Sequence, residues 1–289
     1  MAVPRVYSYR GLVFANMDPA APDFLDYLGE AKHLLDTHLD RSPEGEIEVV
    51  QGAHRTEYRG NWKLQVENSV DGYHGDTVHE SFFKLVAEFG NKGGQHGAYV
   101  QGSVEDIFKH RLTGRTMGFD NGHGMWESPL TPDGLELMRA GPHRGYVEWM
   151  EGKYGTQRSH EMLNSMNLVV FPSLAILHGQ LRVMRPISID RTEVSIYFFR
   201  LKGVSEAYND FRLASHQRFF GPASFGSPDD VEIFAVNQTG LQAEDVDWVL
   251  LSRGMERETM DNRGVRTAEA TDETPQRAFH RGWKQFMAS

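Results

Sequence analysis

Residues 67–79 read Glu67-Asn68-Ser69-Val70-Asp71-Gly72-Tyr73-His74-Gly75-Asp76-Thr77-Val78-His79. Two imidazoles stand five residues apart in this stretch, and carboxylates precede the first of them. A second pair of carboxylates, Asp229-Asp230, lies far downstream. Two His and one Asp or Glu form the ligand set of an open non-haem Fe(II) site, in which the remaining positions stay free for O₂ and substrate.

The spacing of the two imidazoles requires a break in the helix that carries them. Positions i and i+5 lie about 140° apart on a regular helix, so His74 and His79 do not share one face. We expect the helix to end at His74 and Gly75 to supply the break, because glycine tolerates backbone angles that end a helix. Glu67, Asp71 and His74 fall on one face. Carboxylates behind a metal-bound imidazole fix its orientation.

The same residues have ordinary alternatives. The chain has 13 His, and a pair at this spacing also occurs among surface and capping residues. Asp230 follows Pro228-Asp229, where an acid commonly caps a helix or lies in its first turn. A hydrolytic zinc site uses the same ligand types. The residues alone leave these alternatives open.

Two separated motifs carry a resemblance to a known family. The first is Asn61-Trp62-Lys63-Leu64 with Glu67-Asn68, Asp71-Gly72-Tyr73-His74 and His79; the second is Phe220-Gly221-Pro222-Ala223-Ser224-Phe225-Gly226-Ser227-Pro228-Asp229-Asp230. From Tyr9 to its C-terminus the chain resembles the catalytic domain of the large (α) subunit of Rieske non-haem iron aromatic-ring-hydroxylating dioxygenases, in the benzoate and anthranilate dioxygenase branch. The resemblance implies an oxidoreductase of aromatic hydrocarbon catabolism with a helix-grip fold of the Bet v 1/START type.

The resemblance also implies roles for the residues of both motifs. His74, His79 and Asp230 would hold a mononuclear Fe(II) ion, and Asp229 would cap the helix. Asp71 would hydrogen-bond the first imidazole and admit electrons from the Rieske ligand of a neighbouring subunit. Glu67 stands near a position where many relatives hold an amide.

Candidate substrate-contacting residues are less sharply defined. The aromatic candidates and one histidine are Phe82, Phe83, Phe220, Phe225 and His123, each of which has an ordinary structural alternative. Gly226 stands where some relatives have Trp and would widen the pocket. Arg182 and Arg185 fall on opposite faces of a strand, so at most one of them can meet a substrate carboxylate.

The expected activity is O₂-dependent cis-dihydroxylation of a small aromatic compound, an aromatic acid among the candidates. The alternatives are a monooxygenase or O-demethylase with the same iron, or a catalytically incomplete iron-binding subunit. The family assembles as a homotrimer or α3β3 complex and draws electrons from a ferredoxin or reductase. No dinucleotide-binding glycine motif occurs in the sequence.

The absence of Cys bears on where the electrons for an iron-dependent reaction would come from. A [2Fe-2S] Rieske cluster needs two Cys and two His, and this chain has no Cys. Residues 1–45 are expected to be the end of a Rieske domain with its linker, and residues 46–289 the catalytic domain. A fragment, a late start and a natural one-domain form all remain open.

The composition of the chain argues against some classes of binding partner. The formal charge is −10 and the pI about 5.7, which argues against general nucleic-acid binding. The sequence contains no apolar run of membrane-spanning length and no signal-peptide core. We therefore expect a cytoplasmic protein without a membrane segment.

Periodicity and turn residues predict an α+β fold. Short connections between successive β-rich runs favour a curved antiparallel sheet flanked by helices. Helices are expected at 22–39, 61–73, 82–86, 129–155, 205–219, 230–239 with Gly240 as C-cap, and 274–287. Strands are expected at 46–58, 98–104, 116–119, 166–172, 175–186 and 193–201. A glycine-rich loop is expected at 90–97 and a charged surface loop at 255–274.

Overall fold

The computed structural model describes residues 2–90, 103–141, 143–224, 226–245 and 247–288. A ten-stranded sheet lies at its centre, in the order β11-β12-β5-β6-β7-β8-β9-β10-β3, with β4 pairing with a further part of β10. All strand pairings of the described residues are antiparallel. The strands are β3 (Ile47–Val49), β4 (His54–Tyr58), β5 (Arg115–Gly118), β6 (Gly124–Ser128), β7 (Ser165–Val170), β8 (Leu174–Leu177), β9 (Gln180–Ser188), β10 (Arg191–Leu201), β11 (Thr259–Met260) and β12 (Arg266–Glu269).

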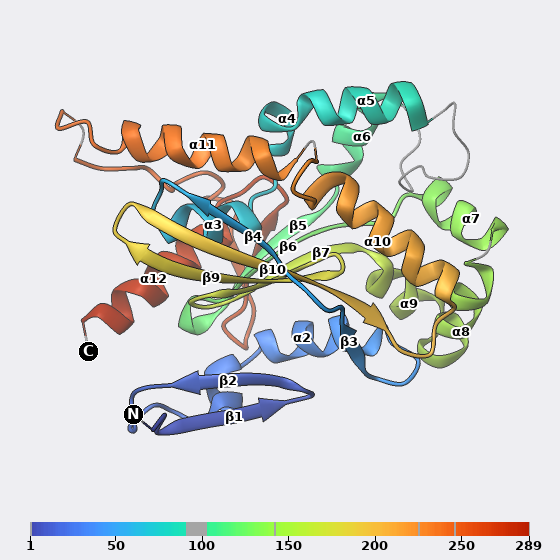
Figure 1. Cartoon of the computed structure of the whole chain (residues 1–289), viewed down its shortest axis with the longest axis horizontal. Coiled ribbons are helices and arrows are strands. Elements are labelled where there is room, and N and C mark those ends of the chain that lie inside the picture. The colour runs from blue at the N-terminus through green and yellow to red at the C-terminus, as the bar shows by residue number, and fades with distance from the viewer. Residues whose placement is uncertain (1, 91–102, 142, 225, 246, 289) are drawn as a thin grey trace.

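Helices cover both faces of the sheet. In Figure 1, α10 and α11 cross above the sheet, whereas α2 lies below it, with the separate hairpin of β1 (Arg5–Tyr9) and β2 (Leu12–Asn16) beyond α2. The helices are α1 (Phe24–Leu28), α2 (Ala31–Asp40), α3 (Trp62–Ser69), α4 (Gly75–Val78), α5 (Glu80–Gly90), α6 (Val104–Arg111), α7 (Pro132–Ala140), α8 (Arg144–Tyr154), α9 (Thr156–Leu163), α10 (Glu206–Phe220), α11 (Ser227–Gly240) and α12 (Thr274–Met287), with a 3₁₀ turn at Asp120–Gly122.

The two faces of the sheet contribute to separate hydrophobic cores. Side chains such as Leu168 and Phe199 pack with Leu35 of α2 and Met150 of α8. The other face packs against α3, α11 and α12, whose buried contacts include Val66, Val70, Phe234 and Phe279. The second core fixes α3 and α11 against one sheet face, and the metal-ligand candidates lie in the first turn of α11 and at the two ends of α4, the short helix after α3.

The predicted α+β class and antiparallel sheet are confirmed, with local differences. The expected helix at 129–155 is two helices, α7 and α8, and α11 begins at Ser227 and includes Gly240 instead of ending before it. Strand β6 was not expected, and the predicted surface loop at 255–274 contains β11 and β12. Of the expected strand at 98–104, residues 98–102 lie outside the described residues, as does most of the loop at 90–97, while Val104 begins α6.

His123 holds three segments together and is completely buried. Its Nε2 lies 2.9 Å from the main-chain oxygen of Tyr27, and its Nδ1 accepts a hydrogen bond of 3.0 Å from the main-chain N–H of Phe171. Both ring nitrogens are therefore engaged by the backbone, which corresponds to the structural alternative for this residue and not to a substrate contact.

His123 should make stability depend on pH. Burial lowers its pKa to about 4, against about 6.5 in an unfolded chain. The imidazole is neutral in both states above pH 6.5, so its contribution is complete there and is lost as pH falls toward 4. The loss should reach about 2–3 kcal/mol at pH 4.5. The free energy of unfolding should be measured with urea at pH 7.5 and at pH 4.5. It should change less between the two pH values in His123→Gln than in the unaltered chain. Equal differences would contradict this role.

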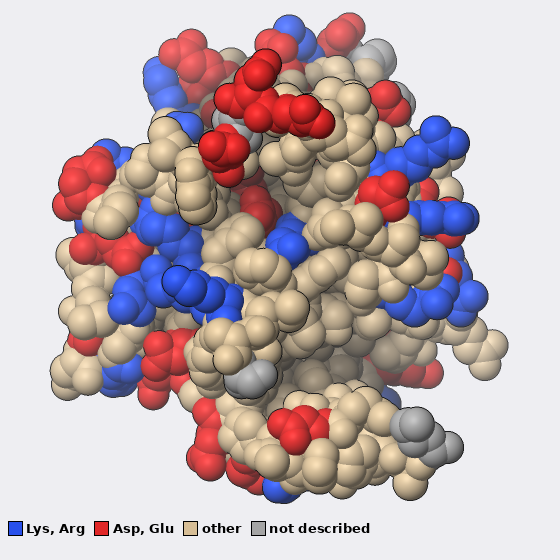
Figure 2. Space-filling model, turned by 90° about the vertical axis from the view of Figure 1, so that its left-hand side faces the viewer, with Lys and Arg blue, Asp and Glu red and all other residues tan. Residues whose placement is uncertain are grey.

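The surface mixes charges of both signs on the face shown in Figure 2, where α11 and α12 end. Acidic and basic side chains alternate around this face, and uncharged side chains occupy much of its centre. Among the described residues, no helix combines the length and the apolar character needed to cross a membrane.

Candidate metal centre

The turn after α3 differs from the expected one. Asn61 caps the start of α3, its side chain accepting a hydrogen bond from the main chain of Lys63 at 3.1 Å. The helix ends at Ser69, not at His74, and Gly75 begins α4 instead of breaking a helix. Asp71 Oδ1 accepts hydrogen bonds from the main-chain N–H groups of Tyr73 at 2.6 Å and His74 at 3.1 Å. A short acidic side chain that bonds the following backbone competes with helical hydrogen bonding, so the bend precedes His74.

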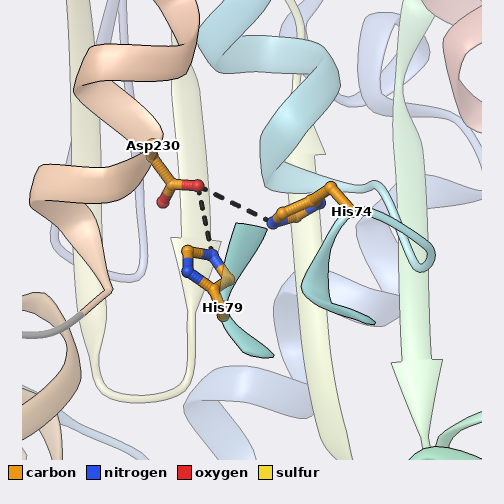
Figure 3. Close-up of side chains that lie close together, drawn as sticks. All are labelled: His74, His79 and Asp230. Atoms are coloured by element: carbon orange, nitrogen blue, oxygen red, sulfur yellow. Dashed lines mark ion pairs between the residues drawn. The ribbon is translucent and has the colours of Figure 1, made fainter. Parts of the chain in front are cut away.

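This bend brings both imidazoles to the first turn of α11. His79 Nε2 lies 3.1 Å from Asp230 Oδ1, and His74 Nε2 lies 3.8 Å from the same oxygen. Figure 3 shows the three side chains pointing toward one another, from α11 on one side and from the two ends of α4 on the other. His79 and Asp230 are buried, and His74 is partly exposed. The predicted meeting of the α3 and α11 regions at one place is thus observed.

The arrangement fits a divalent metal ion. One candidate donor atom from each of the three residues lies within 4.8 Å of the others. Donors with bonds of about 2.0–2.2 Å to one metal lie about 3 Å apart; the 3.1 Å between Asp230 and His79 matches this spacing, and the 3.8 Å between Asp230 and His74 is longer. The Nδ1 atoms of His74 and His79 are buried without a hydrogen-bond partner among the described residues, whereas the Nε2 atoms of both rings lie near Asp230 Oδ1.

The charge of Asp230 also suits a cation. Burial alone would raise its pKa, but the hydrogen bond from His79 and the neighbouring positive groups, Arg182 among them, outweigh burial and hold the pKa below its ordinary value. The carboxylate is therefore ionised at neutral pH and supplies the negative charge that a divalent ion needs in a buried place.

Asn68 is a site residue that the sequence reasoning missed. Its amide nitrogen donates to Asp230 Oδ1 at 3.0 Å and lies 3.2 Å from His74 Nε2. The neighbouring Glu67 points away from the metal-ligand candidates, and its Oε1 lies 2.6 Å from His280 Nε2. The expected face of Glu67, Asp71 and His74 therefore does not form, although Asp71 Oδ1 lies 3.5 Å from His74 Nδ1. The amide that many relatives hold near this position was the sequence signal that could have identified Asn68.

The aromatic candidates separate into two groups. Phe82 packs edge-on against Phe219 at 4.7 Å between ring centres, and Phe219 packs in the same way against His79 at 4.9 Å. Phe220 is buried, with Phe219 at 4.6 Å. Phe219 was not expected at the site, although it is adjacent to a residue that was. Phe83 is buried against Phe82 and Phe108, and Phe225 lies outside the described residues.

Gly226 does not open a wider pocket. A Cβ atom at this position would lie 2.7 Å from ring atoms of Phe219 and equally close to the main-chain oxygen of the same residue. The space beside Gly226 is therefore filled by Phe219, because α10 and α11 approach each other closely here.

Comparisons with known proteins agree with this geometry. Residues 46–289 match the sequence profile of the ring hydroxylating alpha subunit (catalytic domain). The chain belongs to this family. It is 34% identical over 257 residues to the 2-halobenzoate 1,2-dioxygenase large subunit of Burkholderia cepacia, covering 87% of this chain and 53% of that protein. It is also 34% identical over 266 residues to the anthranilate 1,2-dioxygenase large subunit of Acinetobacter baylyi, covering 86% and 54%.

The likeness to a solved family member extends to nearly the whole chain. A structure of naphthalene 1,2-dioxygenase with indole bound in the active site superposes with a TM-score of 0.81 at 24% identity, over 99% of this chain and 65% of that one. This likeness confirms the helix-grip fold expected for the family. The chain spans about half the length of the curated relatives, 53% and 54% for the two dioxygenases named above.

Proposed function

We propose that this chain is an iron-dependent catalytic domain that cis-dihydroxylates a small aromatic acid with O₂. The observation that carries the proposal is the convergence of His74, His79 and Asp230 at the ends of α4 and α11. Two imidazoles and one carboxylate on one side of a metal leave coordination positions free for other ligands. The substrate class is drawn from the relatives, whose names specify 2-halobenzoate, anthranilate and toluate.

The described side chains have separable tasks in this proposal. His74, His79 and Asp230 would hold Fe(II), which when bound would supply the reduced centre for O₂ chemistry. Asn68 donates to Asp230 and so keeps that carboxylate in one orientation. Phe219 places an apolar ring beside His79, and Phe220 continues the apolar surface next to Phe219; these rings would exclude water and provide a surface for an aromatic substrate.

Metal identity separates this proposal from a zinc hydrolase. The purified chain should be loaded anaerobically with Fe(II) or Zn(II) and exposed to nitric oxide, a stand-in for O₂. We expect a nitrosyl electron paramagnetic resonance signal in the iron-loaded chain and benzoate-dependent O₂ uptake when an electron donor is supplied. Hydrolytic activity with zinc and no O₂ uptake with iron would contradict the proposal.

Electrons are proposed to come from a Rieske cluster outside this chain, within a trimeric or α3β3 assembly, and to enter at Asp71. The chain has no Cys to ligate a cluster, and Asp71 is a partly exposed carboxylate that lies beside His74. We expect Asp71→Asn to lower product formation driven by a Rieske donor by at least about tenfold. The asparagine oxygen can still accept from the main chain of Tyr73 and His74, so the turn and iron binding should persist.

The experiment on Asp71 must distinguish a loss of electron transfer from a change in the structure of the metal centre. Peroxide supplies oxygen and electrons together, so peroxide-driven product formation should be retained by Asp71→Asn. Glu80→Gln, which removes an exposed carboxylate paired with Lys84, is the matched control and should leave both reactions unchanged. Equal loss of the peroxide-driven and donor-driven reactions in Asp71→Asn would show a purely structural role.

A further inference from the structure

Arg182 is a buried cation that forms no ion pair with any of the described residues. Its side chain is 2% exposed, and its Nε has no hydrogen-bond partner among the described residues. Burial lowers its pKa to about 10, with the carboxylate of Asp230 acting in the opposite direction. The guanidinium therefore stays charged at neutral pH, and a buried charge without a hydrogen-bonded counter-ion is destabilising.

The position of Arg182 in the sheet directs it toward the candidate metal centre. In β9 it is paired with Ala175 of β8 and Ile196 of β10, both members of the core that packs against α3 and α11. Arg185, three residues on, lies on the opposite face, is exposed and bonds Glu193 at 3.0 Å. The expectation that the two arginines lie on opposite faces is thus confirmed.

A chain of ring contacts connects Arg182 to the metal ligands. Its guanidinium carbon lies 4.9 Å from the centre of the Phe220 ring. Phe220 contacts Phe219, and Phe219 contacts His79. An aromatic ring that lies along this row would have the metal ligands near one edge and the guanidinium near another.

Other unpartnered polar atoms lie on the same sheet face. The amide nitrogen and oxygen of Gln180 and the amide oxygen of Asn167 are buried without hydrogen-bond partners among the described residues. Gln180 precedes Arg182 by two residues, and both it and Asn167 are paired in register with Leu177. Residues two apart on a strand, and residues paired across strands, share one face. Buried polar groups are normally hydrogen-bonded, so this cluster is suited to a polar ligand.

The histidines near Arg182, His178 and His216, are neutral at neutral pH. Burial, together with the charge of Arg182 and other nearby groups, lowers the pKa of His216 to about 3 and that of His178 to about 4. His178 is exposed, whereas His216 is buried. Neither imidazole carries a charge at neutral pH, so the positive charge near His178 comes from arginines, and Arg182 is the one whose guanidinium lies over the Phe220 ring.

We infer that Arg182 binds the carboxylate of the aromatic substrate, with the substrate ring against Phe220 and a ring edge toward His74, His79 and Asp230. A planar guanidinium matches a carboxylate in geometry and charge. A divalent ion on Asp230 would take up the negative charge that now acts on Arg182, which strengthens the need for an anion there. The inference rests on the proposed function for the identity of the ligand as an aromatic acid.

Equilibrium binding to the purified chain tests this inference without turnover. Benzoate and benzamide, which have similar shapes but differ in charge, are titrated calorimetrically under anaerobic conditions with and without Fe(II). Arg182→Gln should weaken benzoate binding by about 10- to 100-fold, the range for lost charge-assisted hydrogen bonds, and change benzamide binding by less than about threefold. Arg185→Gln, on the opposite face of the same strand, is the matched control and should bind both ligands as the unaltered chain does.

The outcomes distinguish this inference from the proposed function. Unchanged benzoate affinity in Arg182→Gln, or an equal loss for benzamide, would overturn the role of Arg182 even if iron-dependent oxygenation were found. If the chain bound benzoate through Arg182 but bound no iron, the carboxylate site would be supported and the proposed iron-dependent activity would be contradicted. The unfolding temperature of Arg182→Gln should be no lower than that of the unaltered chain, because the substitution removes a buried charge. Arg182→Lys retains the charge but loses the planar guanidinium, so it should bind benzoate with intermediate affinity.

Discussion

Replacing His79 by alanine is expected to abolish stoichiometric Fe(II) binding while the chain stays folded. His79 is the ligand candidate nearest to Asp230, with 3.1 Å between Nε2 and Oδ1, and it is 3% exposed. Its loss leaves one imidazole and one carboxylate, too few protein donors for a facial site. The cavity should lower the free energy of unfolding by about 2–3 kcal/mol, at the lower end of the range for large-to-small core changes because the ring borders a polar site.

Metal content after anaerobic loading and gel filtration measures this effect, together with the nitrosyl signal of the iron-loaded chain. His160→Ala is the matched control: it removes a partly exposed imidazole that lies 2.9 Å from Glu151 on a different helix. We expect one equivalent of iron in that variant and far less in His79→Ala. A His79→Ala protein that retains one equivalent of iron with an unchanged nitrosyl signal would rule out the proposed ligand set.

The meeting of the three candidate ligands was predictable from sequence because two local motifs carried them, but the path of the backbone between them was not. A five-residue spacing indicated that the helix must break before His79. The actual break lies earlier, where the side chain of Asp71 bonds the following main chain. Asp-Gly is itself a turn signal, so this correction was accessible from the residues. For Asn68 the only signal was the amide that relatives hold near this position, because which side chain of α3 meets Asp230 depends on the contacts of α3 with α11 and the sheet.

The strands that were missed depend on pairing with distant residues. In β6, Glu127 is buried and bonded to Arg115 of β5 at 2.5 Å, so a charged residue interrupts the apolar pattern by which a buried strand is recognised. Strand β12 is polar and is ordered by pairing with β5, from Arg266 opposite Gly118 to Glu269 opposite Arg115. Such strands are stabilised by tertiary context more than by their own composition.

Alternation along β9 placed Arg182 and Arg185 on opposite faces without deciding which one is inside. That choice follows from the helices that cover the sheet: α10 places Phe220 over Arg182, whereas Arg185 lies in solvent against Glu193. Burial of an arginine runs against the usual distribution of charged residues. Positions where local rules fail are where functional constraints are expected, which is consistent with a ligand-binding role for Arg182.

Replacing Gly72 by alanine is expected to destabilise the chain and disturb the metal centre together. A Cβ atom at this position would lie 1.9 Å from the main-chain oxygen of Ala270 and 2.4 Å from Nε1 of Trp126. Both neighbours are buried, and one of the clashing atoms belongs to the backbone, so the turn itself must move. We expect the free energy of unfolding to fall by about 3 kcal/mol, at the upper end of the usual cost of overpacking. Urea unfolding of the metal-free chain measures this term.

The displaced turn carries Asp71 on one side of Gly72 and His74 two residues beyond it, so Fe(II) affinity should fall by about 10- to 100-fold, as for other losses of ligand orientation. Gly152→Ala separates this effect from a general change of glycine to alanine. Gly152 lies within α8 with no atom near its missing Cβ, and alanine there should raise stability by up to about 1 kcal/mol without changing iron binding. If Gly72→Ala matched Gly152→Ala in both stability and iron affinity, the close approach of the turn to Ala270 would not be what positions His74.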